Sequence, residues 1–542
     1  MCACFDTRVG QVYASVGEIL PDERSAASGA RDVASPGPPS GGRHGMEGFS
    51  ASDGLYGALT GWLSSEEAQG LEHGELEERL ESKGRELVRQ LYQDSLDLRA
   101  CRERRLEVVV GSDGLPRPNV ERAHERSLQT VFGGVTVSRL AYRARGAENL
   151  YVTDAELNLP EEKHSHGLRR LAAVYVPQGS FEDARDAIGR HTGVDLGKRQ
   201  VEELARRAAV DFEAFYERRE HLVAERDDVL VLSCDGKGVV MRPEALRPET
   251  KRKAERSQTK LKTRLSKGEK RNRKRIAEVT AVYEVTPERR TPADILPATD
   301  EQRKAARDGP EAKNKWVAAS VRDDAASMIE RMFEEALRRD GARERTWVAL
   351  VDGNNHQIDR IQTEARRRRV KVQIVVDFVH VLQYLWSAAW SFFDEGAPAA
   401  ERWVKEKARE VLDGNAGIVA ASIRRKATRL HLDPKQRENA DTCADYLLAK
   451  RRYLNYPTAL ANGWPIATGV IEGACRHVVK DRMDITGARW GLQGAEAVLK
   501  LRALKVNGDF EPYWRFHLAQ ERKRVHETRY ASAVIPAPPP TA

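Results

Sequence analysis

The strongest constraint on the fold is a series of five short apolar runs in the second half of the chain. Each run is bounded by turn-forming or charged residues, which is typical of buried strands. The runs are residues 229–234, 276–285, 316–321, 347–351 and 370–376. Their length is too short for buried helices, so we expect five strands that share one sheet.

Helical patterns separate the last three of these runs. Asp323–Arg339 carries an apolar stripe at helical spacing, and residues 356–369 also follow a helical pattern. Three strands, a helix, a strand, a helix and a strand is the order of an RNase H-like core. We therefore predict an α/β fold, with an RNase H-like mixed sheet in a domain of residues 228–510 and a helical insertion at about 394–460.

Upstream of this domain we expect a mainly helical region with one β-hairpin. Residues 25–50 contain fourteen Gly, Pro or Ser among 26 residues, so we interpret residues 1–63 as a disordered leader. Order should begin near Ser64, where Ser64 and Glu67 have the spacing of a capping box. Residues 64–160 should hold a helix and a hairpin that turns at Gly133-Gly134.

Residues 161–227 have the spacing of a helix-turn-helix motif. Ser180 and Asp183 open one helix, Gly193 lies in the turn, and Lys198–Arg207 form a second helix. Its exposed basic residues, Lys198, Arg199 and Arg206, are candidate DNA contacts. Two ordinary packed helices joined by a glycine turn remain the alternative.

The positive charge of the chain is concentrated in one segment. The net charge is +8, while residues 247–275 alone contain fourteen Lys or Arg and three Glu. We expect residues 246–275 to be a basic arm between the first two strands that contacts DNA phosphates, although a solvated charge run is the plain alternative. The candidate contacts are Lys251, Arg252, Lys253, Arg271, Arg273, Lys274 and Arg275.

Three acidic residues are candidates for catalysis. Asp235 and Asp352 each follow an apolar strand and precede a glycine, and Glu472 lies on a later helix. Like charges at one site favour a divalent cation such as Mg²⁺ as a counterion. That helix should present Arg476 and Lys480 on the face of Glu472, as further DNA contacts. Ordinary Asp-Gly turns and a surface Glu472–Arg476 pair are the alternatives.

These acids lie in blocks that resemble bacterial insertion-sequence transposases. The blocks are Asp235–Val239, Val348–Asn354, Asp377–His380, Gly469–Gly473, Val479–Met483 and Gly487–Trp490. They are most similar to the ISKra-type family, which is related to Mutator-like transposases with an Asp-Asp-Glu (DDE) triad. The resemblance covers roughly residues 64–515.

This resemblance implies a metal-dependent enzyme. Asp235, Asp352 and Glu472 would hold two Mg²⁺ ions, or Mn²⁺ in their place, and cut and join DNA by phosphoryl transfer. His380 would orient the scissile phosphate or an attacking water molecule, and a helix histidine bonded to Asp377 is the alternative. The implied partners are the ends of a mobile element, target DNA and further copies of the chain, at least a dimer when bound to the ends.

The sequence gives no support for a P-loop enzyme, a disulfide-rich protein or a membrane-spanning protein. The chain has no P-loop motif, its six cysteines are too scattered for a disulfide framework, and no apolar run is long enough to span a membrane. We expect a cytoplasmic protein of the bacterial nucleoid, with residues 511–542 as a C-terminal tail. A non-catalytic DNA-binding derivative of a transposase and a structure-selective nuclease of the same fold remain alternatives.

Overall fold

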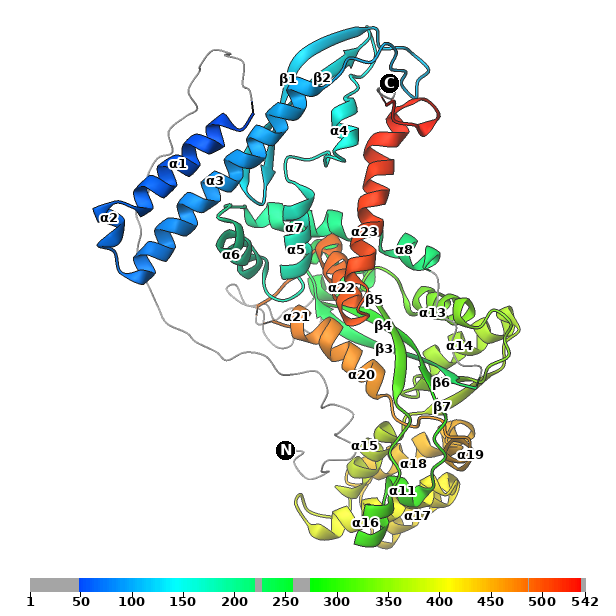
Figure 1. The fold of residues 1–542 in the computed structure, drawn as a ribbon. Coiled ribbons are helices and arrows are strands. Elements are labelled where there is room, and N and C mark those ends of the chain that lie inside the picture. Colours follow the sequence, from blue (N-terminus) through cyan, green and yellow to red (C-terminus); the bar gives the residue numbers. More distant parts are fainter. Residues whose placement is uncertain (1–47, 220–226, 257–272, 486, 538–542) are drawn as a thin grey trace. The chain divides into compact units, whose positions relative to one another are not determined.

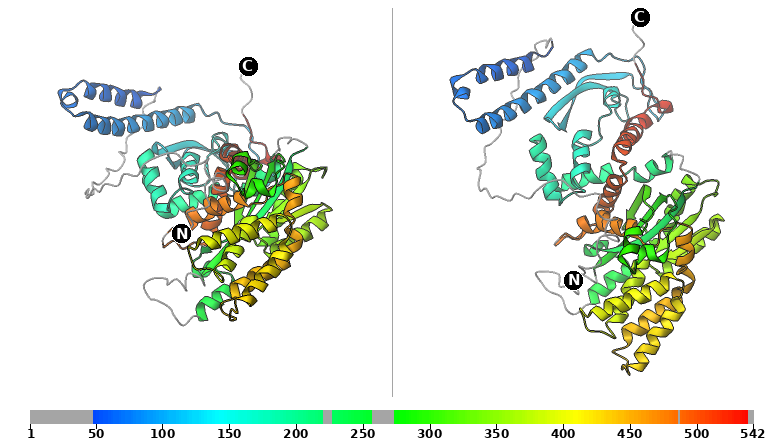
Figure 2. Two further views of the ribbon diagram at one scale, coloured as in Figure 1. Left: turned by 90° about the horizontal axis from the view of Figure 1, so that it is seen from below. Right: turned by 60° about the horizontal axis from the view of Figure 1, so that its bottom comes forward.

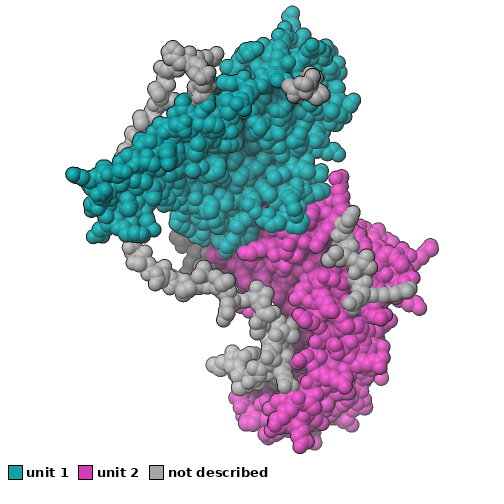
Figure 3. Space-filling model, viewed as in Figure 1, with its two compact units in different colours: residues 1–211, 511–542 teal, residues 212–510 magenta. Residues whose placement is uncertain are grey.

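The computed structural model describes residues 48–219, 227–256, 273–485 and 487–537. They form two compact units, which Figure 3 shows in different colours. Residues 212–510 make one, here named the core unit, and residues 1–211 with 511–542 make the other, the flanking unit. The core unit is thus an insertion within the sequence of the flanking unit.

A five-stranded mixed sheet forms the centre of the core unit (Figure 1). Its strands are β3 (Val229–Val240), β4 (Lys274–Val285), β5 (Ala312–Ser320), β6 (Trp347–Val351) and β7 (Val372–Val376). Their order across the sheet is β5-β4-β3-β6-β7. β4 runs antiparallel to both of its neighbours, whereas β3, β6 and β7 are parallel. The mixed α/β class and all five expected strands are confirmed, with ends that differ by a few residues.

The parallel half of the sheet is buried on both faces, which explains its continuous apolar runs. Leu230–Leu232 of β3 and Val348–Leu350 of β6 are completely buried. Helix α13 (Ala325–Arg339) packs against β3 and β4. Four residues of its predicted apolar stripe, Met328, Ile329, Met332 and Phe333, are buried, and the fifth, Leu337, is half-buried. Helix α14 (Asn355–Arg368) follows β6, so both predicted helices are present.

The chain after β7 is helical, as expected for an insertion. The helices that follow β7 are α15 (Phe378–Ala389), α16 (Pro398–Leu412), α17 (Ala416–Arg429), α18 (Glu438–Lys450), η3 (Arg451–Tyr453) and α19 (Tyr456–Ala461). The right-hand view of Figure 2 shows these helices grouped beside the sheet. Lys426 lies over the rings of Phe392, Phe393 and Trp403, 4.0–5.3 Å from their centroids. This cation–π contact stabilises the packing of α16 against α17.

The remaining helices of the core unit are mostly short. They are α8 (Phe212–Arg218), η2 (Pro243–Ala245), α9 (Pro248–Arg256), α11 (Pro292–Ile295), α12 (Asp300–Ala305), α20 (Gly469–Ala474), η4 (Cys475–Lys480), α21 (Asp481–Met483) and α22 (Leu492–Val506). α20 and η4 contact β3, and α22 contacts β5. The chain thus returns to the sheet after the helical insertion.

The first half of the flanking unit consists of three helices and the predicted hairpin. These are α1 (Ser50–Leu63), α2 (Glu66–Gln69), α3 (His73–Arg102), β1 (Asn119–Thr130) and β2 (Gly133–Arg143). The expectation that order begins near Ser64 is wrong, because α1 is a regular helix. It packs on α3, where the Ser52 amide donates to Asp94 Oδ2 at 2.9 Å. The rest of the expected leader, residues 1–47, lies outside the described residues.

The second half of the flanking unit contains the proposed helix-turn-helix. Its helices are α4 (Val152–Glu156), α5 (His166–Tyr175), α6 (Phe181–Thr192) and α7 (Lys198–Ala208). Ser180 and Asp183 form the expected capping box, and Gly193 ends α6 with a φ of +72°. The inward residues Ile188, Val201 and Leu204 are buried. The two helices and their turn are confirmed, and their binding of DNA stays a prediction.

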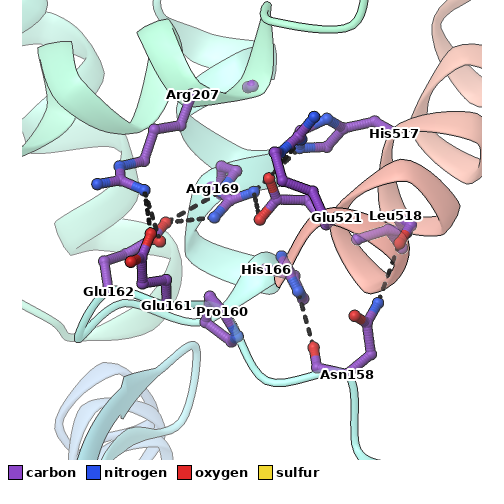
Figure 4. A network of polar contacts seen from close by, with 12 residues as sticks. Asn158, Pro160, Glu161, Glu162, His166, Arg169, Arg207, His517, Leu518 and Glu521 are labelled. Carbon is purple, nitrogen blue, oxygen red and sulfur yellow. Dashed lines mark hydrogen bonds and ion pairs between the residues drawn. The ribbon is translucent and has the colours of Figure 1, made fainter. Parts of the chain in front are cut away.

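Residues 511–537 of the expected C-terminal tail are an ordered part of the flanking unit. They form α23 (Phe510–Glu521), η5 (Arg522–His526), η6 (Glu527–Arg529) and η7 (Ala531–Ala533). Figure 4 shows the polar network that holds α23 to α5. Completely buried Arg169 donates to Glu162 and, at 2.8 Å, to Glu521, and it contacts His517. The interpretation as a tail is therefore wrong for residues 511–537, while residues 538–542 lie outside the described residues. The polar residues of this segment have buried partners more than 300 positions away, which composition does not reveal.

Candidate active site

Asp235 lies inside strand β3 and not at its end, which corrects the sequence prediction. β3 continues to Val240, because its antiparallel pairing with β4 extends over the whole strand. On its other side, the parallel pairing with β6 ends at Ser233 and Leu350. Gly236 therefore forms no turn, and Asp235 lies beyond the end of one neighbouring strand while it is still held by the other.

Three aspartates follow the last paired residues of the parallel strands. Ser233 is opposite Leu350, and Val351 is opposite Val376. If this register is continued, Asp235, Asp352 and Asp377 lie in one row across strands about 4.8 Å apart. The Asp377 amide donates to the Val351 carbonyl at 2.8 Å, so the pairing does extend to this row. Asp377 was not among the predicted acids, although, like Asp352, it directly follows an apolar strand.

The loop after β6 is fixed by the helical insertion. Gly353 has a φ of +95°, and a Cβ at this position would lie 2.8 Å from Tyr446 Oη. That hydroxyl donates to the Asp352 carbonyl at 3.1 Å. The Asp352 Oδ1 accepts the Asn354 amide at 2.8 Å. The glycine is needed both for its backbone conformation and for the close approach of α18.

Glu472 comes from α20, but its helix does not continue regularly. After Ala474 the chain changes to the π-helical turn η4, which widens the spacing of side chains. The α-helical face expected to carry Arg476 and Lys480 beside Glu472 is therefore distorted. Both basic residues are exposed, and Arg476 Nε lies 3.9 Å from Asp481.

Two buried thiols border the acidic residues. Cys475 Sγ donates to Asp235 Oδ2 at 3.3 Å, which ties η4 to β3. Burial, followed by the charge of Asp235, raises the pKa of Cys475, and Glu472 adds to this rise. The pKa of Cys234 is raised by burial, then by Asp352, with a smaller effect of Asp235. Each of the three predicted carboxylates thus raises the pKa of at least one of these two thiols, and both thiols stay protonated.

His380, on α15, lies beside Asp377 at this edge of the sheet. Its Nδ1 lies 2.8 Å from Asp377 Oδ2. This hydrogen bond raises the pKa of His380, and the negative charges of Asp352 and Glu472 raise it further. The bond to Asp377 that the structural alternative for His380 predicts is therefore present, and it leaves Nε2 as the ring nitrogen that is not engaged with Asp377.

Within the described residues, the group whose ligand atoms all lie within 4.8 Å of one another is Asp377, His380 and Glu472. Asp235 and Asp352 do not belong to so tight a group. Asp377 is completely buried and accepts hydrogen bonds on both oxygens, so it orients other groups better than it would bind a cation. The half-buried carboxylates of Asp235, Asp352 and Glu472 are hard oxygen donors of the kind that Mg²⁺ prefers.

Glu278 is an additional acid that the sequence did not single out. It lies on β4 opposite Gly236 and is half-buried. Burial raises its pKa to about 7, and the charge of Asp235 contributes to the rise. An alternating strand pattern carries no signal for such a residue.

The predicted DNA contacts differ in their surroundings. Lys251, Arg252 and Lys253 are exposed on α9, as Lys274 is at the start of β4, and Arg273 before it is half-buried. Arg275 instead donates to the carbonyls of Val321, Ala245 and Arg322, the last two at 3.2 and 3.1 Å. Its guanidinium is therefore bound to the backbone of the protein and supports the fold, so it does not fit the predicted contact with a DNA phosphate. Arg271 and the centre of the basic arm, residues 257–272, lie outside the described residues.

On α7 the basic residues lie beside acids. Lys198 and Arg199 are exposed, and Lys198 Nζ is 3.4 Å from Glu182. Arg206 lies 2.9 Å from Glu203. The exposed pair of Lys198 and Glu182 contributes little to stability, so Lys198 can exchange Glu182 for a phosphate, whereas Arg206 is half-buried.

Two comparisons of the chain with known proteins found no match. The chain matches no family model, and no curated protein matches it. Among the helices that the structure describes, none has the length and apolar character needed to cross a membrane.

Proposed function

We propose that the protein is a DNA transposase of an insertion sequence, with an RNase H-like core unit and a DDE triad of Asp235, Asp352 and Glu472. The observation that carries this proposal is the arrangement of the three acids at one edge of the sheet. Asp235 and Asp352 follow the last paired residues of two parallel strands, and α20 brings Glu472 back to the same sheet. The strand order β5-β4-β3-β6-β7, with only β4 antiparallel to its neighbours, supports the RNase H-like assignment.

The three carboxylates are the proposed ligands of two Mg²⁺ ions, or of Mn²⁺. After burial, the negative charges of Asp235, Asp352 and Glu472 contribute to the raised pKa values of Cys234 and Cys475, and a cluster of like charges suits cations. Bound ions supply the positive charge that activates the attacking oxygen and stabilises the leaving one. His380 directs Nε2 toward the scissile phosphate or the attacking water, while Asp377 holds its other nitrogen.

DNA recognition is divided between the two units in this proposal. The α6–α7 pair reads the ends of the element through Lys198, Arg199 and Arg206. The exposed residues of α9, with Arg273, Lys274, Arg476 and Lys480, contact the phosphate backbone without reading bases. At least two copies of the chain would assemble on a pair of ends.

The test is incubation of the purified protein with DNA that carries the element's own ends, with and without Mg²⁺. Asp235→Asn, Asp352→Asn and Glu472→Gln should each lower cleavage more than ~100-fold, because loss of a ligand costs more than loss of its supporting hydrogen bonds. DNA binding should remain, since amides keep the shape of the side chain. Asp413→Asn, an exposed change at the end of α16, is the matched control.

Different outcomes separate the alternatives. Strong cleavage by any one triad variant would remove that residue from the site. Binding of the ends without cleavage by the wild type would favour a non-catalytic derivative. Cleavage without joining, and without preference for the ends, would favour a structure-selective nuclease.

A further inference from the structure

Asp377 is the most heavily hydrogen-bonded carboxylate near the proposed site. Its Oδ1 accepts the amides of Val379 at 3.0 Å and Thr468 at 3.3 Å. Its Oδ2 accepts His380 Nδ1 at 2.8 Å and Thr468 Oγ1 at 2.7 Å. The side chain is completely buried, so these four donors satisfy a carboxylate that has no access to water.

Thr468 connects this carboxylate to the helix of Glu472. It lies 91 residues after Asp377, on the far side of the helical insertion, and it is buried. Its carbonyl accepts the Glu472 amide at 3.0 Å, and its Oγ1 is 3.4 Å from Glu472 Oε1. The Phe378 amide also donates to the Ile466 carbonyl at 2.8 Å, which closes the base of the insertion.

We propose that Asp377 and Thr468 are positioning residues that fix His380 and Glu472 together at the edge of the sheet. This inference rests on the proposed function for its catalytic meaning. Asp377 holds Nδ1 of His380 as a donor, which leaves Nε2 to act at the site. Through Thr468 it also sets where α20 begins, and hence the position of Glu472 on that helix.

The two ends of the helical insertion are thus joined at one carboxylate. α15 begins at Phe378, directly after Asp377, and α20 begins at Gly469, directly after Thr468. A shift of either end would move a functional side chain, because His380 lies on α15 and Glu472 on α20.

The decisive variant is Thr468→Val, which keeps the shape of the side chain and removes only its hydroxyl. Thr468→Ser restores the hydroxyl. Thr428→Val removes an exposed hydroxyl from α17 that bonds only within its own helix, and it is the matched control. Asp377→Asn tests the carboxylate itself.

Three measurements on the full-length protein give independent readouts. Binding of Mn²⁺ alone, followed by electron paramagnetic resonance, should weaken ~10–100-fold in Thr468→Val and recover in Thr468→Ser. Cleavage of the ends should lose kcat by a similar factor while KM stays unchanged. The ¹⁵N spectrum of labelled histidine should show His380 protonated at Nδ1 in the wild type and should change in Asp377→Asn.

The proposal is overturned if Thr468→Val binds Mn²⁺ and cleaves DNA like the wild type. It is also overturned if Thr468→Ser is as impaired as Thr468→Val, since the hydroxyl would then have no specific role. A wild type that does not cleave would refute the proposed function. The Mn²⁺ affinities and the tautomer of His380 would still decide the positioning role in that case.

Discussion

At the scale of single residues, the core unit contains two kinds of acid. Asp377 is buried with four donors, so its negative charge is balanced by hydrogen bonds. Glu278 is half-buried without comparable support, and its pKa is raised to about 7 by burial and then by nearby charge, including that of Asp235. Asp377 therefore has its hydrogen bonds satisfied within the protein, whereas the charge of Glu278 is disfavoured by its surroundings.

Glu278 gives a prediction about pH and stability. A carboxyl group with a raised pKa stabilises the fold fully below its ordinary pKa of 4.5, and this contribution is lost as the pH rises toward 7. The free energy of unfolding of Glu278→Gln should therefore equal that of the wild type at pH 4. At pH 8 it should be larger by about 1–2 kcal/mol, a value reduced for solvent screening. Urea unfolding at both pH values measures this difference. The exposed change Glu401→Gln should show no such dependence, and an equal effect of Glu278→Gln at both pH values would contradict the assignment.

At the scale of elements, the basic residues of α9 and the start of β4 are of two kinds. The exposed ones are proposed DNA contacts, and Arg275 supports the fold. Changing Lys251, Arg252, Lys253 and Lys274 to Gln should weaken DNA binding for all sequences and reduce the salt slope by ~0.9 for each phosphate that is no longer neutralised. The melting temperature should not change, because these side chains are exposed.

Arg275→Gln should instead destabilise the protein by about 1–3 kcal/mol, since backbone carbonyls lose their donor. DNA binding in salt titrations and calorimetric melting distinguish the two variants. If the quadruple variant and the wild type have equal salt slopes, the four changed residues do not contact DNA and α9 is only a solvated helix.

The attachment of α23 gives a second prediction at this scale. Burial opposes ionisation of Asp211, but hydrogen bonds from His517 and Arg524 outweigh it and lower its pKa to about 2. A lowered pKa stabilises the fold above the ordinary value of 3.8, and the effect is lost as the pH falls toward 2. Asp211→Asn should therefore destabilise the flanking unit at pH 7 and progressively less below pH 4. Amide hydrogen exchange along α23 measures this, and protection unchanged at pH 7 would show that Asp211 does not anchor the helix.

At the scale of the whole molecule, the sequence predicted what is local and missed what is distant. The five strands were predictable because buried parallel strands are continuous apolar runs, as in Leu230–Leu232. The hairpin and the capping box of α6 were predictable from turn and cap residues. The position of Asp235 inside β3 was not, because it depends on where β6 stops pairing. The role of Asp377 and the burial of α23 depend on partners far away along the chain, Thr468 and Arg169.

The discontinuous flanking unit determines how the protein can be divided. Removal of residues 1–210 alone would leave α23 and the segment after it without partners for Tyr513, His517 and Tyr530, which are buried in the intact unit. A cut at both boundaries avoids this, because α8 is held to the end of the core unit by Tyr216, whose hydroxyl donates to Asp509 at 2.9 Å. We expect residues 212–510 to unfold cooperatively and to nick DNA with Mg²⁺, but without preference for the ends of the element.

The comparison that tests this division is between residues 212–510 and residues 211–542. The longer chain should aggregate or bind a hydrophobic dye, because it exposes the buried face of α23, whereas the shorter chain should give a single sharp melting transition. Binding of end and random DNA by the shorter chain, measured at one salt concentration, should then be equal. If the shorter chain still prefers the ends, recognition lies in the core unit and the helix-turn-helix interpretation of α6 and α7 is wrong. If only the longer chain folds, α23 stabilises the core unit, and the boundary at residue 510 does not separate two independent folding units.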